Sequence, residues 1–472
     1  MYISVDVMIS VKMYDEDFRL AKPSEVGMNV KRFPNTTTTP TDMSFDFLYT
    51  PPSGTVNIPS RKVEDTAIPL SQRVSGSSSE GTSVQLLSRG PQDVYLTYNP
   101  EMSLFKRVYK RYTNFAIEHN EEKFSTTVRF GTKNTIAVPK RGDLVGSMVL
   151  RVVLPNLNIT GGTWVGTAGY NIIAGAALRI GDTQIQTTES LWLDIDDKLF
   201  CPDSKYAGIS KLVKRGEVLT TDQAWEIFVP LKFFCCKNTT SKQQFIPILN
   251  LAPNINVYVD FTFKTLSSLV NLPANAQLPD NVQLAAGLIV EYAFLDTTEK
   301  YRFAQSPTSI TFDRVYSIDK NTYLTTTNGQ TMNQNKIDVD LRELNKPVKY
   351  FAIVAYPEND ITGFTYYDIF EKGTFYLNSN QQFSPRSSEY FSIVQKYQHF
   401  RRCDPSDNIL TYSFALDAMS FQPNGSLNFA PYTKAKLSFD IFPQIVPKKI
   451  KVFAVTIDFI VFENGMCRML FA

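Results

Sequence analysis

The sequence predicts an all-β protein, in which two tandem antiparallel β-sandwiches follow an extended N-terminal arm. The 472 residues include 34 Phe and 23 Tyr, and aromatic and β-branched side chains favour strands. Short runs of such residues alternate with turn signals, without long helical patterns between them, as is typical of sandwiches. The pattern restarts near residue 290, so the second half carries about as many strands as the first.

The arm comprises residues 1–92 and differs in texture from the rest of the chain. It contains a run of threonines before Pro40, the pair Pro51-Pro52, and a stretch rich in Ser and Gly at residues 75–81. Such polar sequence cannot bury enough apolar area to offset its ordering entropy alone. We expect an arm that orders only against neighbouring molecules, with one short strand near Tyr2–Met8; the alternative is a disordered tail.

Residues 93–123 form the next predicted segment, a base on which the sandwiches stand. The pair Asn99-Pro100 initiates a turn. After it, large apolar residues recur at helical spacing, at Leu104, Phe105, Val108, Tyr109 and Tyr112. Basic residues occupy other positions of the same stretch, at Lys106, Arg107, Lys110 and Arg111. The pattern predicts a short amphipathic helix with one apolar and one basic face.

The first sandwich is predicted over residues 124–293. Its strand candidates are Thr126–Phe130, Thr135–Val138, Gly146–Leu154, Ala176–Ile180 and Asn256–Phe263. A buried strand is predicted at Leu288–Leu295, where the pattern restarts. Residues Asp222–Phe228 are interpreted as a helical turn in a loop. The long stretches Asn156–Tyr170 and Cys201–Ala224 are expected to be loops.

The second sandwich is predicted over residues 294–472. It opens with Asp296–Glu299, which has the form of a helix cap or tight turn. Strand candidates follow at Ile310–Tyr316, Val348–Ala355, Thr374–Leu377, Ile409–Ala415, Ala435–Phe439 and Lys451–Phe462. Because sandwich loops vary freely, we expect the long loop Pro357–Tyr366, with the two above, to form outward or inter-subunit surfaces.

Charge and cysteine content narrow the class of protein. The 48 basic and 46 acidic residues leave a net charge of +2, whereas a nucleic-acid binder shows a strong basic excess. The five cysteines (Cys201, Cys235, Cys236, Cys403 and Cys467) are irregularly spaced, so a reducing compartment is expected rather than a disulfide framework. The chain shows no apolar run of spanning length and no signal-peptide pattern. We expect a soluble protein made and assembled in the cytosol.

Catalytic and metal-binding patterns are weak. The only histidines, His119 and His399, have no Gly-flanked Ser nearby, and Cys403 follows His399 without a protease signature. Adjacent strand residues point to opposite faces, so Cys235 and Cys236 are interpreted as buried thiols rather than as metal ligands. No phosphate-binding glycine loop occurs. The sequence therefore predicts no enzyme, no cofactor and no metal.

One stretch carries a specific family resemblance. Residues 93–118 are similar to the N-terminal signature of the major capsid proteins of nucleocytoplasmic large DNA viruses, D-x-Y-L-T-G-N-P-x-x-T-F-F-K-x-V-Y-x-R-H-T-N-F-A. Residues 291–305 resemble the family's junction, D-Y-I-Y-L-D-x-x-E-R-x-x-F-A-Q, and residues 344–349 its L-N-H-P-V-K element. Residues 377–399 follow the family's L-N-G-x-x-R-F-S-x-R-x-x-x-Y-F-N-x-V-Q-P-Y-Q-H without a gap.

The chain also departs from the family pattern. Tyr98 stands where the family has Gly, and Gln382, Ser392 and Lys396 replace Arg, Asn and Pro. The last residues, 464–472, differ from the usual ending, and the arm is longer than the family's short leader. These differences keep open a minor or vertex-associated paralogue.

The resemblance implies a double jelly roll, two eight-stranded sandwiches side by side, whose homotrimers form pseudo-hexagonal capsomers that tile an icosahedral virion capsid. In this family the N-terminal segment faces the interior. Lys106, Arg107, Lys110 and Arg111 are thus candidates to meet minor capsid proteins or an internal membrane, the alternative being a solvated face.

Jelly rolls also build carbohydrate-binding proteins, for which Trp164 and the pair Tyr366-Tyr367 are the candidate residues. Four N-glycosylation sequons, at Asn35, Asn158, Asn238 and Asn424, leave glycosylation open.

Overall fold

The structure is a computed structural model. It describes residues 84, 86–88, 90–236, 238–239, 242–274, 276–321, 325–327, 330–332, 336–357, 364–420, 422–442 and 448–471. Most of the predicted arm, including the strand expected at Tyr2–Met8, lies outside the described residues. The chain divides into two units, residues 1–107 and 108–472. In the first unit, helix α2 (Val94–Thr97) is one short turn, with the backbone N–H of Gly90 donating to the Asp93 carboxylate at 2.7 Å.

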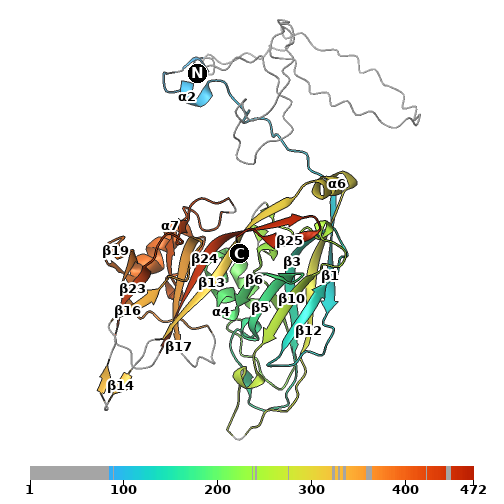
Figure 1. Ribbon diagram of the computed structural model, residues 1–472, viewed down its shortest axis with the longest axis vertical. Coiled ribbons are helices and arrows are strands. Elements are labelled where there is room, and N and C mark those ends of the chain that lie inside the picture. Colours follow the sequence, from blue (N-terminus) through green and yellow to red (C-terminus); the bar gives the residue numbers. More distant parts are fainter. Residues whose placement is uncertain are drawn as a thin grey trace, which may run out of the picture. The chain divides into compact units, whose positions relative to one another are not determined.

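The second unit begins with a sandwich of two antiparallel four-stranded sheets (Figure 1). The first sheet has the order β1-β12-β3-β7 and the second β2-β10-β5-β6. The strands are β1 (Phe115–Lys123), β2 (Lys133–Val138), β3 (Leu144–Leu154), β5 (Ile173–Ile180), β6 (Thr183–Glu189), β7 (Trp225–Pro230), β10 (Val257–Phe263) and β12 (Ala285–Leu295). Strand β3 shows why they form: Met148, Leu150 and Val152 alternate into the core with period two.

A second sandwich follows and repeats the arrangement. Its sheets have the orders β13-β24-β17-β21 and β16-β23-β18-β19. The strands are β13 (Thr308–Asn321), β16 (Lys336–Asp340), β17 (Pro347–Pro357), β18 (Phe370–Leu377), β19 (Asn380–Gln381), β21 (Leu410–Ser413), β23 (Ala435–Ile441) and β24 (Lys448–Glu463), with β20 (Arg386–Ser387), β22 (Leu427–Asn428) and β25 (Met466–Met469) added at the sides.

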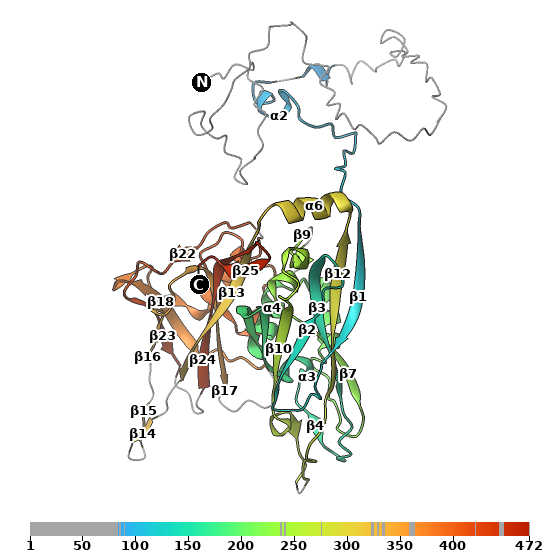
Figure 2. The same cartoon turned by 45° about the vertical axis from the view of Figure 1, so that its right-hand side comes forward.

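The two sandwiches share one topology. When the eight strands of each are counted in chain order, both sandwiches have one sheet ordered 1-8-3-6 and another ordered 2-7-4-5. This interleaving of early and late strands is that of a jelly roll. The predicted fold, two tandem eight-stranded antiparallel jelly rolls, is confirmed. Figure 2 shows the two rolls standing side by side, with helix α6 (Thr297–Gln305) on the path from one to the other.

Shorter elements fill the connections. The helices are α3 (Ala168–Asn171), α4 (Ser190–Phe200), α5 (Asp203–Leu212) and α7 (Gln395–His399), which continues a π-helical turn, Tyr390–Val394. The two-stranded ribbons are β4 (Thr163–Trp164) with β11 (Val270–Asn271), β8 (Asn238–Thr239) with β9 (Lys242–Gln243), and β14 (Thr325–Thr327) with β15 (Gln330–Met332). Asp296, expected in a cap or turn, is the N-cap residue of α6.

The amphipathic helix predicted for Leu104–Tyr112 is wrong. Residues 104–105 form a turn, and residues 107–114 have no regular secondary structure before β1 begins. A helix this short is unstable in water unless its apolar face packs against something. Here that face has no such support within the described chain, because Phe105 is 99% exposed and Leu104 85% exposed.

Three further expectations differ from the structure. Strand β1, placed by sequence in the base segment, pairs along its whole length with β12 and so belongs to the first roll. Asp222–Phe228 is not a helical turn, since β7 begins at Trp225 and buries Ile227 and Val229 in alternation. Thr126–Phe130 contributes only an isolated bridge at Arg129.

Candidate functional site

The joint between the two jelly rolls is built around helix α4. Trp192, Ile195 and Leu199, spaced along one helical face, are almost completely buried. They share a hydrophobic cluster with side chains from one sheet of the second roll, among them Tyr350 on β17 and Phe453 on β24. A helix from the first roll thus provides the apolar surface against which the second roll packs.

Aromatic rings dominate this cluster. The Trp192 and Phe453 ring centroids lie 5.2 Å apart. Phe200, at the end of α4, lies 5.7 Å from Tyr350 and 5.6 Å from Phe400. Such pairs add about 0.5–1.5 kcal/mol each beyond the burial of their area. The joint is therefore packed like a domain interior rather than like a flexible linker.

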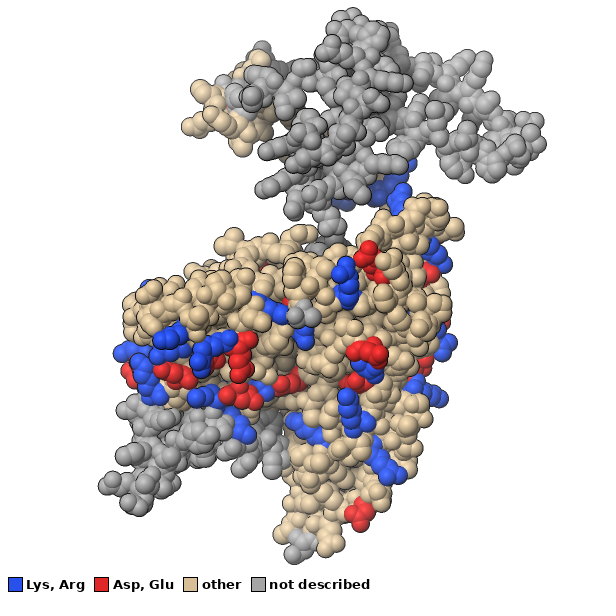
Figure 3. Space-filling view, in the orientation of Figure 1, with Lys and Arg blue, Asp and Glu red and all other residues tan. Residues whose placement is uncertain are grey.

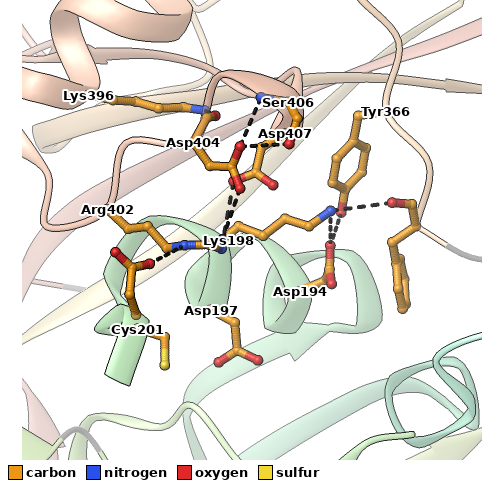
Figure 4. A network of polar contacts seen from close by, with 12 residues as sticks. Asp194, Asp197, Lys198, Cys201, Tyr366, Lys396, Arg402, Asp404, Ser406 and Asp407 are labelled. Atoms are coloured by element: carbon orange, nitrogen blue, oxygen red, sulfur yellow. Dashed lines mark hydrogen bonds and ion pairs between the residues drawn. The ribbon is translucent and has the colours of Figure 1, made fainter. Parts of the chain in front are cut away.

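The other face of α4 carries three buried aspartates, Asp194, Asp196 and Asp197. Asp194 accepts from Arg215 at 2.6 Å, lies 3.0 Å from the Lys198 Nζ, and accepts the Tyr366 hydroxyl at 2.9 Å. Tyr366 belongs to the second roll, so its hydroxyl connects the two rolls (Figure 4). Burial, together with the negative Asp194, raises the pKa of Tyr366 well above its usual value.

Asp197 holds the deepest ion pair of the joint. Its carboxylate lies 2.5 Å from the Lys232 Nζ and accepts the Tyr170 hydroxyl at 2.5 Å. Burial alone would lower the pKa of Lys232, but Asp196 and Asp197 beside it raise that pKa above its ordinary value. Lys232 therefore stays protonated, and its charge is balanced within the structure.

A second group of charged residues, which includes Arg402, Asp404 and Asp407, comes from the second roll and lies near the C-terminal end of α4 (Figure 4). Arg402 lies 2.9 Å from Asp203 and 2.9 Å from Asp404, and its backbone N–H donates to the Leu199 carbonyl at 3.1 Å. Its guanidinium stacks over the Tyr206 ring at 3.7 Å from the centroid. Because Asp203 and Tyr206 lie on α5, Arg402 fastens the second roll to the first.

Two contacts outside α4 complete the attachment. Lys451 on β24 lies 2.5 Å from Glu189 at the end of β6. On the connection between the rolls, Lys300 of α6 lies 2.9 Å from Asp143. The Asp143 carboxylate also accepts a hydrogen bond from the backbone N–H of Leu295. The rolls are therefore linked at several separated points, which fixes their relative orientation.

The buried tyrosines of the joint predict a loss of stability in alkaline solution. A phenol whose pKa is raised by folding contributes stability that is present below its ordinary pKa of 10.0 and lost as pH rises through the raised value. We expect the free energy of unfolding to fall above pH 10, by up to about 1.4 kcal/mol per pH unit for each such tyrosine. Urea unfolding between pH 7 and 11 measures it.

The matched variants for this prediction are Tyr366→Phe and Tyr367→Phe. The first removes one buried hydroxyl and is expected to make the alkaline decline shallower, whereas the second changes a side chain that is 37% exposed and serves as control. Identical pH dependence in Tyr366→Phe and the unchanged protein would contradict this interpretation of the joint.

The candidate basic residues Lys106, Arg107, Lys110 and Arg111 are all exposed, on the stretch that precedes β1. The structure does not gather them on a helix face. Within the described chain none of them has an ion-pair partner. On the face shown in Figure 3, basic and acidic side chains are interspersed over the second roll, without a broad patch of one sign.

The same stretch carries an unusual density of exposed apolar side chains. From α2 to the start of β1, the large side chains exposed by 70% or more are Tyr95, Leu96, Tyr98, Met102, Leu104, Phe105, Val108, Tyr109 and Tyr112. Monomeric proteins rarely leave a contiguous apolar surface of this kind in water. We call residues 95–112 the N-terminal contact segment.

The other candidate residues occupy structural positions. Trp164 is 3% exposed and Tyr366 5% exposed, so neither presents the open ring that a sugar site needs. The Nδ1 of His399 lies 3.0 Å from the Leu416 carbonyl, and in the described part of the chain no nucleophile hydrogen-bonds to it. Among the same residues, no group of His, Cys, Asp and Glu is arranged to hold a metal, and no helix is long and apolar enough to cross a membrane.

The cysteine pair differs from the expected strand. Phe234–Cys236 is a 3-10 turn, so the Cys235 and Cys236 sulfurs lie 3.8 Å apart rather than on opposite faces. The hydrogen bond with the Cys236 thiol, together with burial, raises the pKa of Cys235. Cys235 is buried and Cys236 is half-buried.

Two of the predicted loops supply residues to the joint, and the outward or inter-subunit role expected of all three loops stays a prediction. Cys201–Ala224 contains helix α5 and supplies Arg215 to Asp194. The loop Pro357–Tyr366 ends in the buried Tyr366, and its residues 358–363 lie outside the described part. Of the sequons, Asn158 is exposed, whereas the Asn424 amide donates to the Asp417 carbonyl at 3.1 Å. Asn35 lies outside the described residues.

Two family descriptions match this chain in succession. The description "Major capsid protein N-terminus" matches residues 103–296, and "Large eukaryotic DNA virus major capsid protein" matches residues 299–467. Together they cover both jelly rolls up to residue 467. They also include residues 103–112 of the N-terminal contact segment. The division between the two descriptions falls at the start of α6, where the structure passes from one roll to the other.

Curated relatives and solved structures agree with this pattern. The chain is 28% identical over 418 residues to the major capsid protein of Pyramimonas orientalis virus, covering 82% of this chain and 98% of that protein. It is 28% identical over 390 residues to the major capsid protein of Paramecium bursaria Chlorella virus 1, covering 75% and 86%. Among structures, a quasi-atomic model of the PBCV-1 virus capsid shares the fold with a TM-score of 0.68, at 23% identity, over 78% of this chain and 100% of that one.

Proposed function

Since the chain belongs to the family of major capsid proteins of large eukaryotic DNA viruses, we propose that it forms homotrimeric capsomers that tile an icosahedral virion shell. Three copies bring six sandwiches around one axis, which gives the trimer a pseudo-hexagonal outline. The observation that carries the proposal is the repetition of one jelly-roll topology in two rigidly joined halves. The role is structural, and we assign no catalysis to it.

The rigid joint suits a shell subunit. If the two rolls turned freely, a trimer would have no constant hexagonal shape and could not tile a surface regularly. The packed aromatic cluster, the hydrogen bond from Tyr366 to Asp194 and the ion pair of Arg402 with Asp203 hold the two rolls in one orientation. A trimer built from such subunits presents the same edges to every neighbouring capsomer.

The N-terminal contact segment supplies an attachment beneath the capsomer. Its exposed apolar side chains need a partner surface, and minor capsid proteins are the partners that we propose. The exposed Lys106, Arg107, Lys110 and Arg111 fit an anionic neighbour, including the surface of an internal membrane. Each basic residue near such a membrane adds about 1 kcal/mol of binding energy.

The oligomeric state tests the central proposal. Light scattering of the purified protein is expected to give a mass about three times that of the 53.4 kDa chain, with hexagonal outlines in negative-stain images. Obligate interfaces commonly bury more than about 2,000 Å², so the trimer should persist on dilution to nanomolar concentration. A stable monomer at micromolar concentration would overturn the capsomer assignment.

The alternatives have less support. Of the aromatic candidates for a carbohydrate site, Trp164 and Tyr366 are buried in the fold, whereas Tyr367 is 37% exposed and has the Lys448 Nζ 3.5 Å from its ring centroid. A minor or vertex-associated role rests only on the departures of the sequence from the family pattern, and the copy number of the chain per virion distinguishes it from the bulk shell. We place assembly in the host cytoplasm, which the five free cysteines fit, because reducing compartments keep thiols reduced.

A further inference from the structure

A cavity of about 550 Å³ lies at the joint, beside the ion pair of Asp196 with Lys232, which forms part of its lining. Helices α4 and α5 and the end of β7 line it from the first roll. Asp313 on β13, Arg401 after α7, and Ala418 and Met419 after β21 line it from the second. Its size falls within the roughly 300–1,000 Å³ that small-molecule sites occupy in proteins. A molecule bound here would touch both rolls at once.

The wall of the cavity is mostly apolar. Phe200 and Ile209 contribute side chains from the two helices, Leu231 follows β7, and Met419 comes from the second roll. Leu231 is almost fully buried and the other three are partly exposed toward the opening. Such a wall favours an aliphatic or aromatic body over a fully hydrated ion.

The acidic residues that line the cavity are paired with cations, whereas two of its basic residues have no ion-pair partner in the described chain. The two acidic residues have cationic partners: Asp196 lies 3.4 Å from Lys232, and Asp313 lies 3.5 Å from Lys349. The cations Lys205 and Arg401 are exposed, and no carboxylate of the described chain lies within ion-pair distance of either. The Arg401 guanidinium lies 3.8 Å from the Met419 sulfur. The unmatched charge of the cavity is therefore positive and comes from both rolls.

We propose that this cavity binds a small amphipathic anion, an alkyl carboxylate, with its charge held between Lys205 and Arg401 and its chain against the apolar wall. The ligand bridges the two rolls, because Lys205 belongs to the first and Arg401 to the second. Binding stabilises the folded chain by mass action, in proportion to the logarithm of ligand concentration over Kd. The site does not depend on the shell function and is testable on the purified full chain.

The experiment is calorimetric titration of the full chain with dodecanoate below its micelle concentration, and with dodecyltrimethylammonium as the matched ligand of opposite charge. We expect one dodecanoate per chain and at least tenfold weaker binding of the cation. The double variant Lys205→Ala/Arg401→Ala is expected to weaken dodecanoate binding about tenfold, and Met419→Trp to block the cavity. Lys211→Ala, an exposed lysine on the same helix but outside the lining, should bind as the unchanged chain does.

A second readout locates the ligand. Cys236 lines the cavity and Cys403 does not, so dodecanoate should slow alkylation of Cys236 relative to Cys403. Thermal unfolding without ligand shows whether each variant is folded. Because Lys205 and Arg401 are exposed, replacing them should leave the fold intact, so the double variant is the decisive test of the site. The proposal is overturned by absence of dodecanoate binding to the unchanged chain, by equal binding of both amphiphiles, or by unchanged affinity in the double variant; the last two results would indicate adsorption to the N-terminal contact segment.

Discussion

Replacing Asp197 by alanine is expected to lower the free energy of unfolding by about 3–5 kcal/mol, because the change removes the nearer of the two carboxylates that balance the charge of the largely enclosed Lys232 ammonium. The Tyr170 hydroxyl loses its acceptor at the same time. Asp196, at 3.4 Å from Lys232, compensates only in part. Urea unfolding followed by circular dichroism at pH 7 measures the loss.

An exposed ion pair provides the matched control. Glu121 lies 3.1 Å from Arg151 on the first sheet, and both side chains are more than a third exposed. Glu121→Ala should cost no more than about 1 kcal/mol, since water screens such pairs. The double variant Asp197→Ala/Lys232→Met removes both buried charges and is expected to recover much of the lost stability. Equal costs for Asp197→Ala and Glu121→Ala would show that the joint is hydrated and not a buried network.

The consequence for assembly follows from where α4 lies. Asp197 and the apolar face of Trp192, Ile195 and Leu199 belong to the same eleven-residue helix. Displacing that helix disturbs the surface on which the second roll packs. We therefore expect Asp197→Ala chains that remain folded to assemble poorly, even though no residue of the joint need touch a neighbouring subunit.

The sequence predicts the sheets well because their signal is local. Period-two burial on β3, and in part on β10, is visible in the residues themselves, and the continuous apolar run of β17 marks a strand that is buried on both faces. The repeat of the jelly roll near residue 290 follows from the restart of that pattern. The sequence pattern did not predict strand β1, because it is an edge strand with several glutamates and Glu122 is its one buried residue.

The joint between the two rolls could be predicted from the sequence to a much smaller extent than the sheets. Helix α4 has Trp192, Ile195 and Leu199 at helical spacing, a signal that was available. Its three aspartates argue for an exposed helix, and only the positions of Lys232, Arg215 and Tyr366, which are distant in sequence, reverse that expectation. Buried ion pairs depend on partners that no local pattern announces.

The failed helix at residues 104–112 has a different cause. Its pattern of alternating apolar and basic residues is real, but a pattern does not specify the surface that the apolar face covers. The described part of the chain provides no such surface, and the residues are exposed there. A helix here would need an external partner to stabilise it.

The contact segment can accordingly be altered without cost to the fold. A quadruple variant changes Leu104, Phe105, Val108 and Tyr109 to serine. We expect its free energy of unfolding to lie within about 1 kcal/mol of that of the unchanged chain, because exposed side chains contribute little to folding. It should still form trimers, since the rolls and their joint are untouched. Its incorporation into virus particles is expected to fall at least tenfold, which quantitative mass spectrometry of purified virions measures.

A second variant separates the apolar role of the segment from its charge. Changing Lys106, Arg107, Lys110 and Arg111 to glutamine keeps the apolar side chains and removes four charges. This variant should lose binding to phosphatidylserine-containing vesicles, by up to about 1 kcal/mol per residue, while the serine variant keeps much of that electrostatic attraction. Unchanged incorporation of the serine variant would contradict a contact role for the apolar residues, and a lowered unfolding midpoint would show that they pack within their own chain. Only a variant that folds, trimerises and yet stays out of particles places the partner of this segment beyond the capsomer itself.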